Sequence, residues 1–255
     1  MNFSLDQVPV RTVKPRQSGL TMVMDKGLGV RQAEDLVESS GPFVDLVKLG
    51  FGSSYITPRL EDKLAVYRNA GLPVYLGGTL LEAFIIRNKF EDYLRLIDKY
   101  KLSYAEVSDG SITLAHDQKL EYIRRLSKQV TVITEVGSKE EGIIIHPNKW
   151  IELINSELQA GAWKVIAEAR ESGTVGIYRP SGKAHVVLIN KIISQVSADK
   201  IIWEAPNKGG QTYFIKLLGA NVNLGNIAPN EVIAVESLRI GLRSDTFFQY
   251  LDKKH

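Results

Sequence analysis

Short β-rich runs alternate with longer amphipathic runs throughout this chain of 255 residues. The runs typical of strands cover residues 20–25, 43–50, 73–78, 104–110, 131–137, 164–170, 200–206 and 221–226. Helical patterns follow them at residues 30–40, 58–71, 81–101, 116–129, 147–161, 186–196, 211–219 and 229–243. Strands that alternate with helices through short connections form parallel sheets. The sequence therefore predicts an α/β fold with a parallel sheet.

The number of repeats and the chain length indicate how this sheet closes. A (β/α)8 TIM barrel takes ~250 residues, and no stretch divides this chain into two halves. We expect one barrel domain over residues 1–255, with residues 1–19 as an N-terminal extension leading into the first strand. An open doubly wound sheet is the alternative. The glycines at 27–30 and 49–52 do not match the GxGxxG fingerprint, so they do not favour a dinucleotide fold.

Composition excludes several classes of site. The chain has 32 basic and 29 acidic residues, a narrow balance that does not indicate a nucleic-acid-binding protein. It has no cysteine, which excludes disulfides, thiolate metal sites and a cysteine nucleophile. The N-terminal stretch lacks the apolar core of a signal peptide, and no apolar run approaches the ~20 residues of a spanning helix. We expect a cytoplasmic protein with neither nucleic acid nor membrane as a partner.

Glutamates recur near the ends of four predicted strands. Glu106, Glu135, Glu168 and Glu204 are separated by 29, 33 and 36 residues, about one strand–helix unit each. In a barrel the C-terminal strand ends and the loops after them form the active-site face. The repeat therefore predicts a group of carboxylates at one mouth of the barrel.

The alternation of side chains along a strand sharpens this prediction. Glu135, Glu168 and Glu204 each lie two residues beyond an isoleucine, so they share its face, and Lys48 likewise shares a face with Leu46. Clustered carboxylates raise one another's pKa, and a divalent cation relieves their repulsion. Carboxylate oxygens suit Mg²⁺, so we expect these three glutamates to be metal ligands. The alternative is a structural ion-pair network at the barrel mouth.

Other polar residues near strand ends are candidates for catalysis or substrate binding. Lys139 follows a strand end, where its ammonium would reach over the mouth, although surface lysines are common. Arg170, Ser172 and Gly173 form a turn of the kind that holds phosphate or sulfonate, although ordinary loops also contain such residues. Asn223 in the last predicted strand would complete a polar wall.

Nine motifs spread over almost the whole chain resemble the phosphosulfolactate synthase family. They are DKG (25–27), DLVKLGFGSS (45–54), GGTL (77–80), EVSDGS (106–111), TEVGSK (134–139), EARESG (168–173), WEAPNK (203–208), VNLGNI (222–227) and ESLRIGLRSDTF (236–247). The resemblance implies a magnesium-dependent (β/α)8 enzyme that adds sulfite to phosphoenolpyruvate and gives (2R)-2-phospho-3-sulfolactate, on one route to coenzyme M. It implies that Lys139 is the general acid. Lys48 and Arg170 would neutralise the two anionic substrates.

Two departures from the family pattern are Ser53–Ser54 and Gly225, and neither removes a charged group. The family also resembles a plant heat-stress-associated protein. Two alternatives therefore stay open: a non-enzymatic stress-related or regulatory protein, and a related lyase that uses another enolate-forming phosphorylated acid. Enzymes of this architecture often associate, so a homo-oligomer stays open as well.

Overall fold

The computed structural model describes residues 2–137, 145–169 and 174–252. Eight strands form one sheet in the order β3-β2-β1-β8-β7-β6-β5-β4, and each paired strand is parallel to its neighbour. They are β1 Thr21–Asp25, β2 Leu46–Leu49, β3 Val74–Leu76, β4 Tyr104–Val107, β5 Thr131–Val136, β6 Ala162–Ala167, β7 Ile201–Glu204 and β8 Leu224–Ile227. The predicted (β/α)8 barrel is confirmed.

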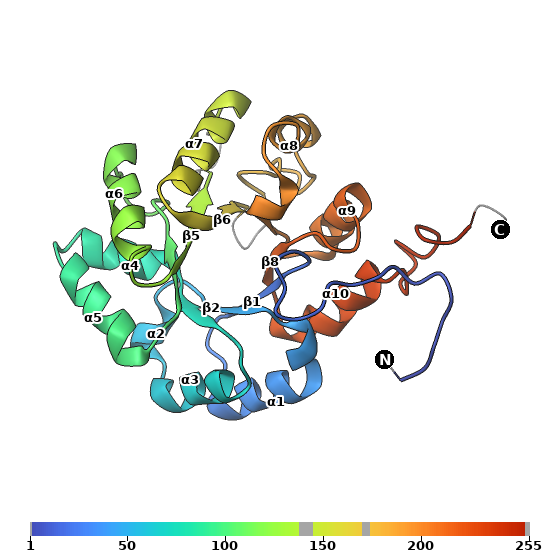
Figure 1. Cartoon of the computed structure of the whole chain (residues 1–255), viewed down its shortest axis with the longest axis horizontal. Helices are drawn as coiled ribbons and strands as arrows, with labels where there is room; N and C mark the ends of the chain where they lie inside the picture. Colours follow the sequence, from blue (N-terminus) through green and yellow to red (C-terminus); the bar gives the residue numbers. More distant parts are fainter. Residues whose placement is uncertain (1, 138–144, 170–173, 253–255) are drawn as a thin grey trace.

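Helices surround the strands as a ring (Figure 1). They are α1 Val30–Ser40, α2 Ser53–Ile56, α3 Leu60–Asn69, α4 Gly78–Ile85, α5 Phe90–Tyr100, α6 His116–Leu126, α7 Pro147–Gln159, α8 Val186–Ile193, α9 Lys208–Leu218 and α10 Val232–Arg239. In the described parts of the chain, none of these helices has the length and apolar character needed to cross a membrane.

One predicted helix is two helices in the structure. The run at 81–101 divides into α4 and α5 around Asn88, whose φ of 56° lies in the left-handed region. Asparagine adopts this conformation more readily than most residues. The amide of Lys89 then donates to the carbonyl of Phe84 and closes the turn. The prediction of one continuous helix was wrong because no proline or glycine marks this break.

Hydrogen bonds link the two strands at the ends of the sheet order, β3 and β4, which lie in contact. The amide of Gly78, the first residue of α4, donates to Glu106 Oε1 on β4 at 2.7 Å. Ser108, after β4, donates through Oγ to Glu82 Oε1 on α4. A Cβ at residue 78 would lie 2.2 Å from Ser108 Oγ, so this close approach requires glycine. Buried carboxylates thus join the two edges.

The apolar core lies in two layers. A large outer cluster fills the space between the strands and the helices. The smaller inner cluster fills the barrel and comprises Leu20, Met22, Leu46, Tyr75, Ile133, Ile166 and Ile202. The prediction that the side chains of Leu46, Ile133, Ile166 and Ile202 point into the barrel is thereby confirmed. Because side chains two residues apart share a face, the polar residues beyond them point into the same barrel.

The residues before β1 cross the N-terminal end of the barrel, opposite the predicted mouth. Arg11 pairs with Glu236 on α10 at 2.8 Å, and Arg16 pairs with Asp45, just before β2, at 3.0 Å. Both pairs are largely shielded from solvent. This segment is therefore tied to the first and last parts of the barrel.

Arg239 at the end of α10 joins the starts of β1 and β8. It is fully buried, and its guanidinium donates to the carbonyls of Ala220, Val222 and Leu20 at 2.8, 2.6 and 2.9 Å. Burial lowers the pKa of Arg239 to about 9, with the nearby charge of Arg11 adding to the effect. Its several carbonyl partners offset part of the cost of burying the charge.

Candidate active site

Three glutamates meet at the C-terminal end of the barrel. Glu135 is in β5, Glu168 follows β6, and Glu204 ends β7. One carboxylate oxygen from each lies within 4.8 Å of the others, and all three residues are buried. The sequence repeat at strand ends predicted this grouping, and the parallel barrel produces it because equivalent strand ends meet on one face.

Lys48 lies among these carboxylates. Its Nζ is 2.9 Å from Glu106 Oε2 and 3.6 Å from Glu135 Oε2, and its side chain is only 5% exposed. Burial by itself lowers the pKa of Lys48, but the charges of Glu106 and Glu135 outweigh burial and raise the pKa well above its ordinary value. Lys48 is therefore a fixed positive charge at working pH.

Glu106 and Tyr75 complete the surroundings of Lys48. Glu106 is buried and receives the Gly78 amide through its other oxygen. Tyr75 lies beside Lys48 in the strand register, and burial together with the Glu106 charge raises the pKa of its hydroxyl. The strand-end repeat had singled out Glu106 without assigning it a partner. Tyr75 carries no sequence signal, since a tyrosine in a strand is ordinarily a packing residue.

Glu204 has an unusual protonation equilibrium. Burial, and then the charge of Glu135, raises the pKa of Glu204 to about 7. The amide of Ala169 donates to its Oε2 at 2.8 Å and limits the rise. Without a cation in the group, Glu204 is therefore partly protonated near neutral pH.

The donor set suits a hard divalent cation. The three converging groups are all carboxylates, and Mg²⁺ prefers oxygen ligands and takes only a few from the protein. Lys48 contacts Glu106 and Glu135 of this group. A cation at the three glutamates would be held by carboxylate oxygens, so these residues fit Mg²⁺.

An outer network holds the end of β5 in place. Lys119 on α6 donates to the Glu135 carbonyl at 2.6 Å and pairs with Glu157 on α7 at 2.8 Å. Asp109, after β4, lies 3.0 Å from the same ammonium. Burial by itself lowers the pKa of Lys119, but the charges of Glu157 and Asp109 raise it overall. This network fixes the backbone that carries Glu135, while the Glu135 side chain points into the barrel.

Four of the predicted site residues lie outside the part of the chain that the structure describes. They are Lys139, Arg170, Ser172 and Gly173. In the sequence, residue 139 follows the end of β5 by three positions, and residues 170–173 directly follow Ala169. Their roles stay predictions.

The structure places Asn223 at the opposite end of the barrel. Its Nδ2 donates to the carbonyls of Asp199 and Ile201 at 3.1 and 3.0 Å, and its Oδ1 accepts the Leu20 amide at 3.1 Å. The expected position was wrong because β8 begins at Leu224, so Asn223 precedes the strand and lies at its N-terminal end.

Asn226, near the C-terminal end of β8, was missed by the sequence reasoning. It is buried, its φ is 56°, and its Oδ1 has no hydrogen-bond partner among the described residues. A left-handed asparagine in a strand is not visible from the residue pattern. Its position at the active-site end makes its amide a candidate contact for a ligand.

Sequence comparison relates nearly the whole chain to one family. The family model for (2R)-phospho-3-sulfolactate synthase matches residues 9–245. Phosphosulfolactate synthase of Bacillus subtilis is 39% identical over 250 residues, which cover 97% of this chain and 99% of the relative. Protein HEAT-STRESS-ASSOCIATED 32 of Arabidopsis thaliana is 23% identical over 265 residues, covering 92% of this chain and 91% of the plant protein.

Structural comparison agrees with the barrel. The crystal structure of 3-hexulose-6-phosphate synthase from Salmonella typhimurium superposes with a TM-score of 0.58, covering 87% of this chain and 99% of that one. The two sequences are only 11% identical, so this similarity concerns the fold alone.

Proposed function

The chain belongs to the phosphosulfolactate synthase family, and from this premise we propose that it catalyses the magnesium-dependent addition of sulfite to phosphoenolpyruvate. The product is (2R)-2-phospho-3-sulfolactate, which makes the protein a carbon–sulfur lyase acting in the synthetic direction. The observation that carries this proposal is the meeting of Glu135, Glu168 and Glu204 beside Lys48 at the C-terminal end of the barrel.

The carboxylates have the first role in this proposal. Glu135, Glu168 and Glu204 would hold Mg²⁺, which when bound supplies positive charge near the negative charge that develops on the substrate carboxylate. Lys48 stays charged and is held by Glu106 and Glu135. It adds a second, fixed positive charge to the chamber that receives two anions.

The covalent step requires one new bond and one proton. The sulfur of sulfite bonds to the methylene carbon of phosphoenolpyruvate, and the electron pair of the double bond moves toward the adjacent carbon and its carboxylate. Lys139 then gives its proton to that adjacent carbon, which balances the addition. Arg170, Ser172 and Gly173 are assigned to binding the substrate anions, because holding two anions together is itself a large part of catalysis.

The test is a direct assay of the purified chain. We expect phosphosulfolactate, detected by mass spectrometry, when phosphoenolpyruvate, sulfite and magnesium are all present, and none when any one is omitted or EDTA is added. Lys139→Ala should abolish or greatly slow product formation. Lys149→Ala is the matched control, because Lys149 is a half-exposed lysine on α7 that pairs with Glu152.

Absence of product from wild-type protein with a native circular dichroism spectrum would overturn the proposal. The same assay repeated with other enolate-forming phosphorylated acids would then separate a related lyase from a non-enzymatic protein. A non-enzymatic role also requires that Lys139→Ala leave the function unchanged.

A further inference from the structure

Two buried groups beside Lys48 lack hydrogen-bond partners and are complementary to each other. The Tyr75 hydroxyl has no partner among the described residues. Glu106 Oε2 faces Lys48 Nζ at 2.9 Å, but this ion pair lacks the alignment of a hydrogen bond, and no other donor in the described chain meets that oxygen. The hydroxyl is thus a donor without an acceptor, and the oxygen is an acceptor without a directed donor. Buried polar groups are nearly always paired in folded proteins, so both require an explanation.

The Tyr75 side chain lies inside the barrel. It belongs to the inner cluster, is fully buried, and pairs with Lys48 in the register of β2 and β3. Burial, and then the charge of Glu106, raises the pKa of its hydroxyl well above the ordinary value, with Lys48 opposing and Glu204 adding to the rise. The hydroxyl therefore lies among charges carried by β2, β4 and β7. It stays protonated at working pH and can donate a hydrogen bond.

Lys48 is held unequally by its two carboxylates. Its Nζ is 2.9 Å from Glu106 Oε2 but 3.6 Å from Glu135 Oε2. Although burial opposes it, the charges of both carboxylates keep the pKa of Lys48 well above the ordinary value. A lysine ammonium is a compact charge on a flexible four-carbon stem, so it can turn toward an anion that enters the chamber. Such a turn would take from Glu106 Oε2 the charge that now faces it.

We propose that Tyr75 is a positioning residue that releases Lys48 to the substrate anion. When Lys48 turns from Glu106 to the phosphate or carboxylate of phosphoenolpyruvate, the Tyr75 hydroxyl donates to Glu106 Oε2 in its place. Glu106 then keeps two donors, because the Gly78 amide already donates to Oε1. This inference rests on the proposed function, which supplies the anion. It assigns Tyr75 neither contact with the substrate nor transfer of a proton.

The exchange gives a reason for a tyrosine at residue 75. A phenylalanine would fill the same space in the inner cluster, and it would spare the substrate-free protein an unpaired buried hydroxyl. In the bound state the hydroxyl would meet a carboxylate, and hydrogen bonds to charged acceptors are stronger than those between neutral groups. Without that donor, Glu106 would be left as a buried charge with its partner withdrawn, which is strongly unfavourable.

Calorimetric titration of the full chain with phosphoenolpyruvate and magnesium, without sulfite, tests the exchange. Tyr75→Phe removes only the hydroxyl. We expect its Kd for phosphoenolpyruvate to rise between about 10-fold and 100-fold, the range for a hydrogen bond to a charged group. The thermal midpoint of the ligand-free variant should stay at or above the wild-type value, because the lost hydroxyl had no partner. In the turnover assay KM should rise by the same factor, with kcat within about twofold of wild type.

Tyr93→Phe is the matched control. Tyr93 on α5 is also fully buried, its hydroxyl also has no partner among the described residues, and burial followed by the Glu106 charge raises its pKa. It differs in belonging to the outer cluster, between the strands and the helices. The Kd of Tyr93→Phe should therefore stay within about twofold of wild type.

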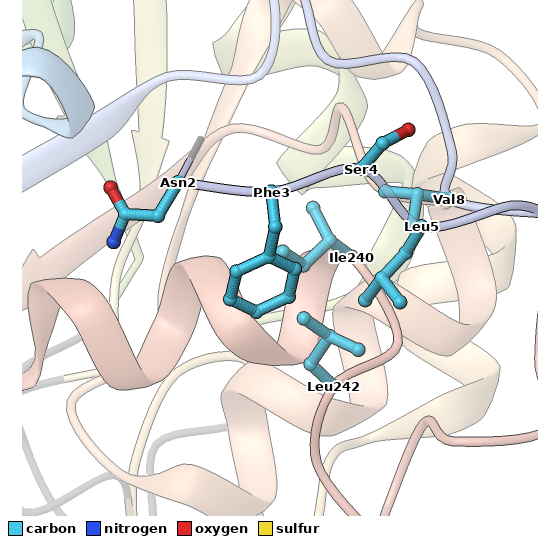
Figure 2. Close-up of a pocket in the computed structure, with 7 residues that line it drawn as sticks. All are labelled: Asn2, Phe3, Ser4, Leu5, Val8, Ile240 and Leu242. Carbon is cyan, nitrogen blue, oxygen red and sulfur yellow. The ribbon is translucent and has the colours of Figure 1, made fainter.

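A second control concerns a hollow far from Lys48 in the sequence. A pocket of about 610 Å³ lies between the N-terminal segment and the residues after α10 (Figure 2). The side chains that line it are uncharged, and most of them, such as Phe3, Leu5 and Leu242, are apolar. It does not suit an anion, so Ser4→Ala, which removes a hydroxyl there, should leave the Kd unchanged.

A double-mutant cycle shows whether Tyr75 acts through Glu106. In the Glu106→Gln background the carboxylate charge is absent, so Tyr75→Phe should weaken binding by less than about twofold. A full effect of Tyr75→Phe in that background would mean that the hydroxyl contacts the ligand directly, and it would overturn the exchange.

Two other results would overturn the inference while leaving the proposed function intact. One is an equal Kd for wild type and Tyr75→Phe, and the other is an equal weakening by Tyr93→Phe. A wild type that binds phosphoenolpyruvate but forms no product would overturn the proposed function alone, since the comparison of Kd values still decides the role of Tyr75. A wild type that does not bind phosphoenolpyruvate would overturn both.

Discussion

Lys48 Nζ and Glu106 Oε2 lie 2.9 Å apart inside the barrel, where both side chains are almost fully excluded from solvent. The pair joins β2 to β4, and the second oxygen of Glu106 receives the Gly78 amide after β3. The Glu106 carboxylate therefore has two roles. It holds neighbouring parts of the barrel wall together, and it pairs with the Lys48 charge at the candidate site.

Breaking this pair should destabilise the fold. Glu106→Gln leaves the Lys48 ammonium buried without its nearest carboxylate, and such a loss typically lowers the free energy of unfolding by about 3 kcal/mol. Urea denaturation at fixed pH measures it. Glu61→Gln is the control, because Glu61 pairs with Lys99 at 3.8 Å and both side chains are exposed, so its effect should be close to zero. Equal losses in the two variants would contradict the role given to Glu106.

The three converging glutamates should be needed for the response to magnesium. Glu135→Gln, Glu168→Gln and Glu204→Gln each remove one charge from the proposed magnesium site, so each should lower kcat/KM at least about a hundredfold at low magnesium, with partial recovery as magnesium rises. The measurement is a magnesium titration of the rate. Glu157→Gln is the matched control, since Glu157 is equally buried but lies in the outer network with Lys119. It should change stability without shifting the magnesium midpoint.

The raised pKa of Glu204 predicts how the stability of the metal-free protein depends on pH. The folded state holds the Glu204 proton up to a pKa of about 7, whereas the ordinary value is 4.5. Between these values the folded state binds more protons than the unfolded state, so stability falls as pH rises. The contribution is about 3 kcal/mol, present below pH 4.5 and lost above pH 7.

Urea denaturation in EDTA across pH 5–8 checks this prediction. Glu204→Gln cannot titrate, so the difference in unfolding free energy between wild type and variant should shrink or change sign as pH rises. A difference that is constant with pH would show that Glu204 ionises normally.

A methyl group at residue 78 should disturb the join between β3 and β4. The Cβ of Gly78→Ala would meet Ser108 Oγ at 2.2 Å and Glu106 Oε1 at 3.0 Å. Overpacking of this kind costs about 1–3 kcal/mol of unfolding free energy. The control is Gly52→Ala, where no atom lies within 4 Å of the added Cβ. Denaturation of the two variants side by side should show a loss only at residue 78.

Asn223 should matter for stability and not for catalysis. Asn223→Ala removes three hydrogen bonds at the N-terminal end of the barrel, two of them buried, with an expected loss of about 2 kcal/mol in unfolding free energy. The kcat/KM of the folded fraction should stay at the wild-type value.

Asn226→Gly keeps the left-handed backbone and removes an amide at the active-site end, so it should raise KM about tenfold. A loss of catalysis in Asn223→Ala, or an unchanged KM in Asn226→Gly, would contradict the positions given to these two residues.

Much of the fold follows from periodicity. All eight strands form where the β-rich runs lie, and the alternation of Ile133 with Glu135 and of Ile202 with Glu204 correctly gives the inward face. Prediction from the local pattern fails where tertiary packing selects an uncommon backbone conformation. A left-handed φ breaks a helix at Asn88 and distorts a strand at Asn226, and neither position is marked by a glycine or proline.

The carboxylates of the candidate site could also be predicted from the sequence. Their positions at the ends of β-rich runs are visible in the residue pattern, and the barrel brings such strand ends together. The partner of Lys48 depends instead on how β2 and β4 are placed on either side of β3, and no local pattern encodes that placement. Asn223 shows the related error, since a shift of the strand start from 221 to 224 moves a residue from one end of the barrel to the other.

The position of Arg239 affects when β1 can complete its packing during synthesis on the ribosome. Arg239, which ties the starts of β1 and β8, lies 219 residues after Leu20 in the sequence, so β1 waits for all of this intervening chain. At about 5–20 residues per second, these residues take roughly 11–44 seconds to synthesise. During that interval β1 has one strand edge open, and a nascent chain of this architecture is exposed to chaperones until α10 emerges.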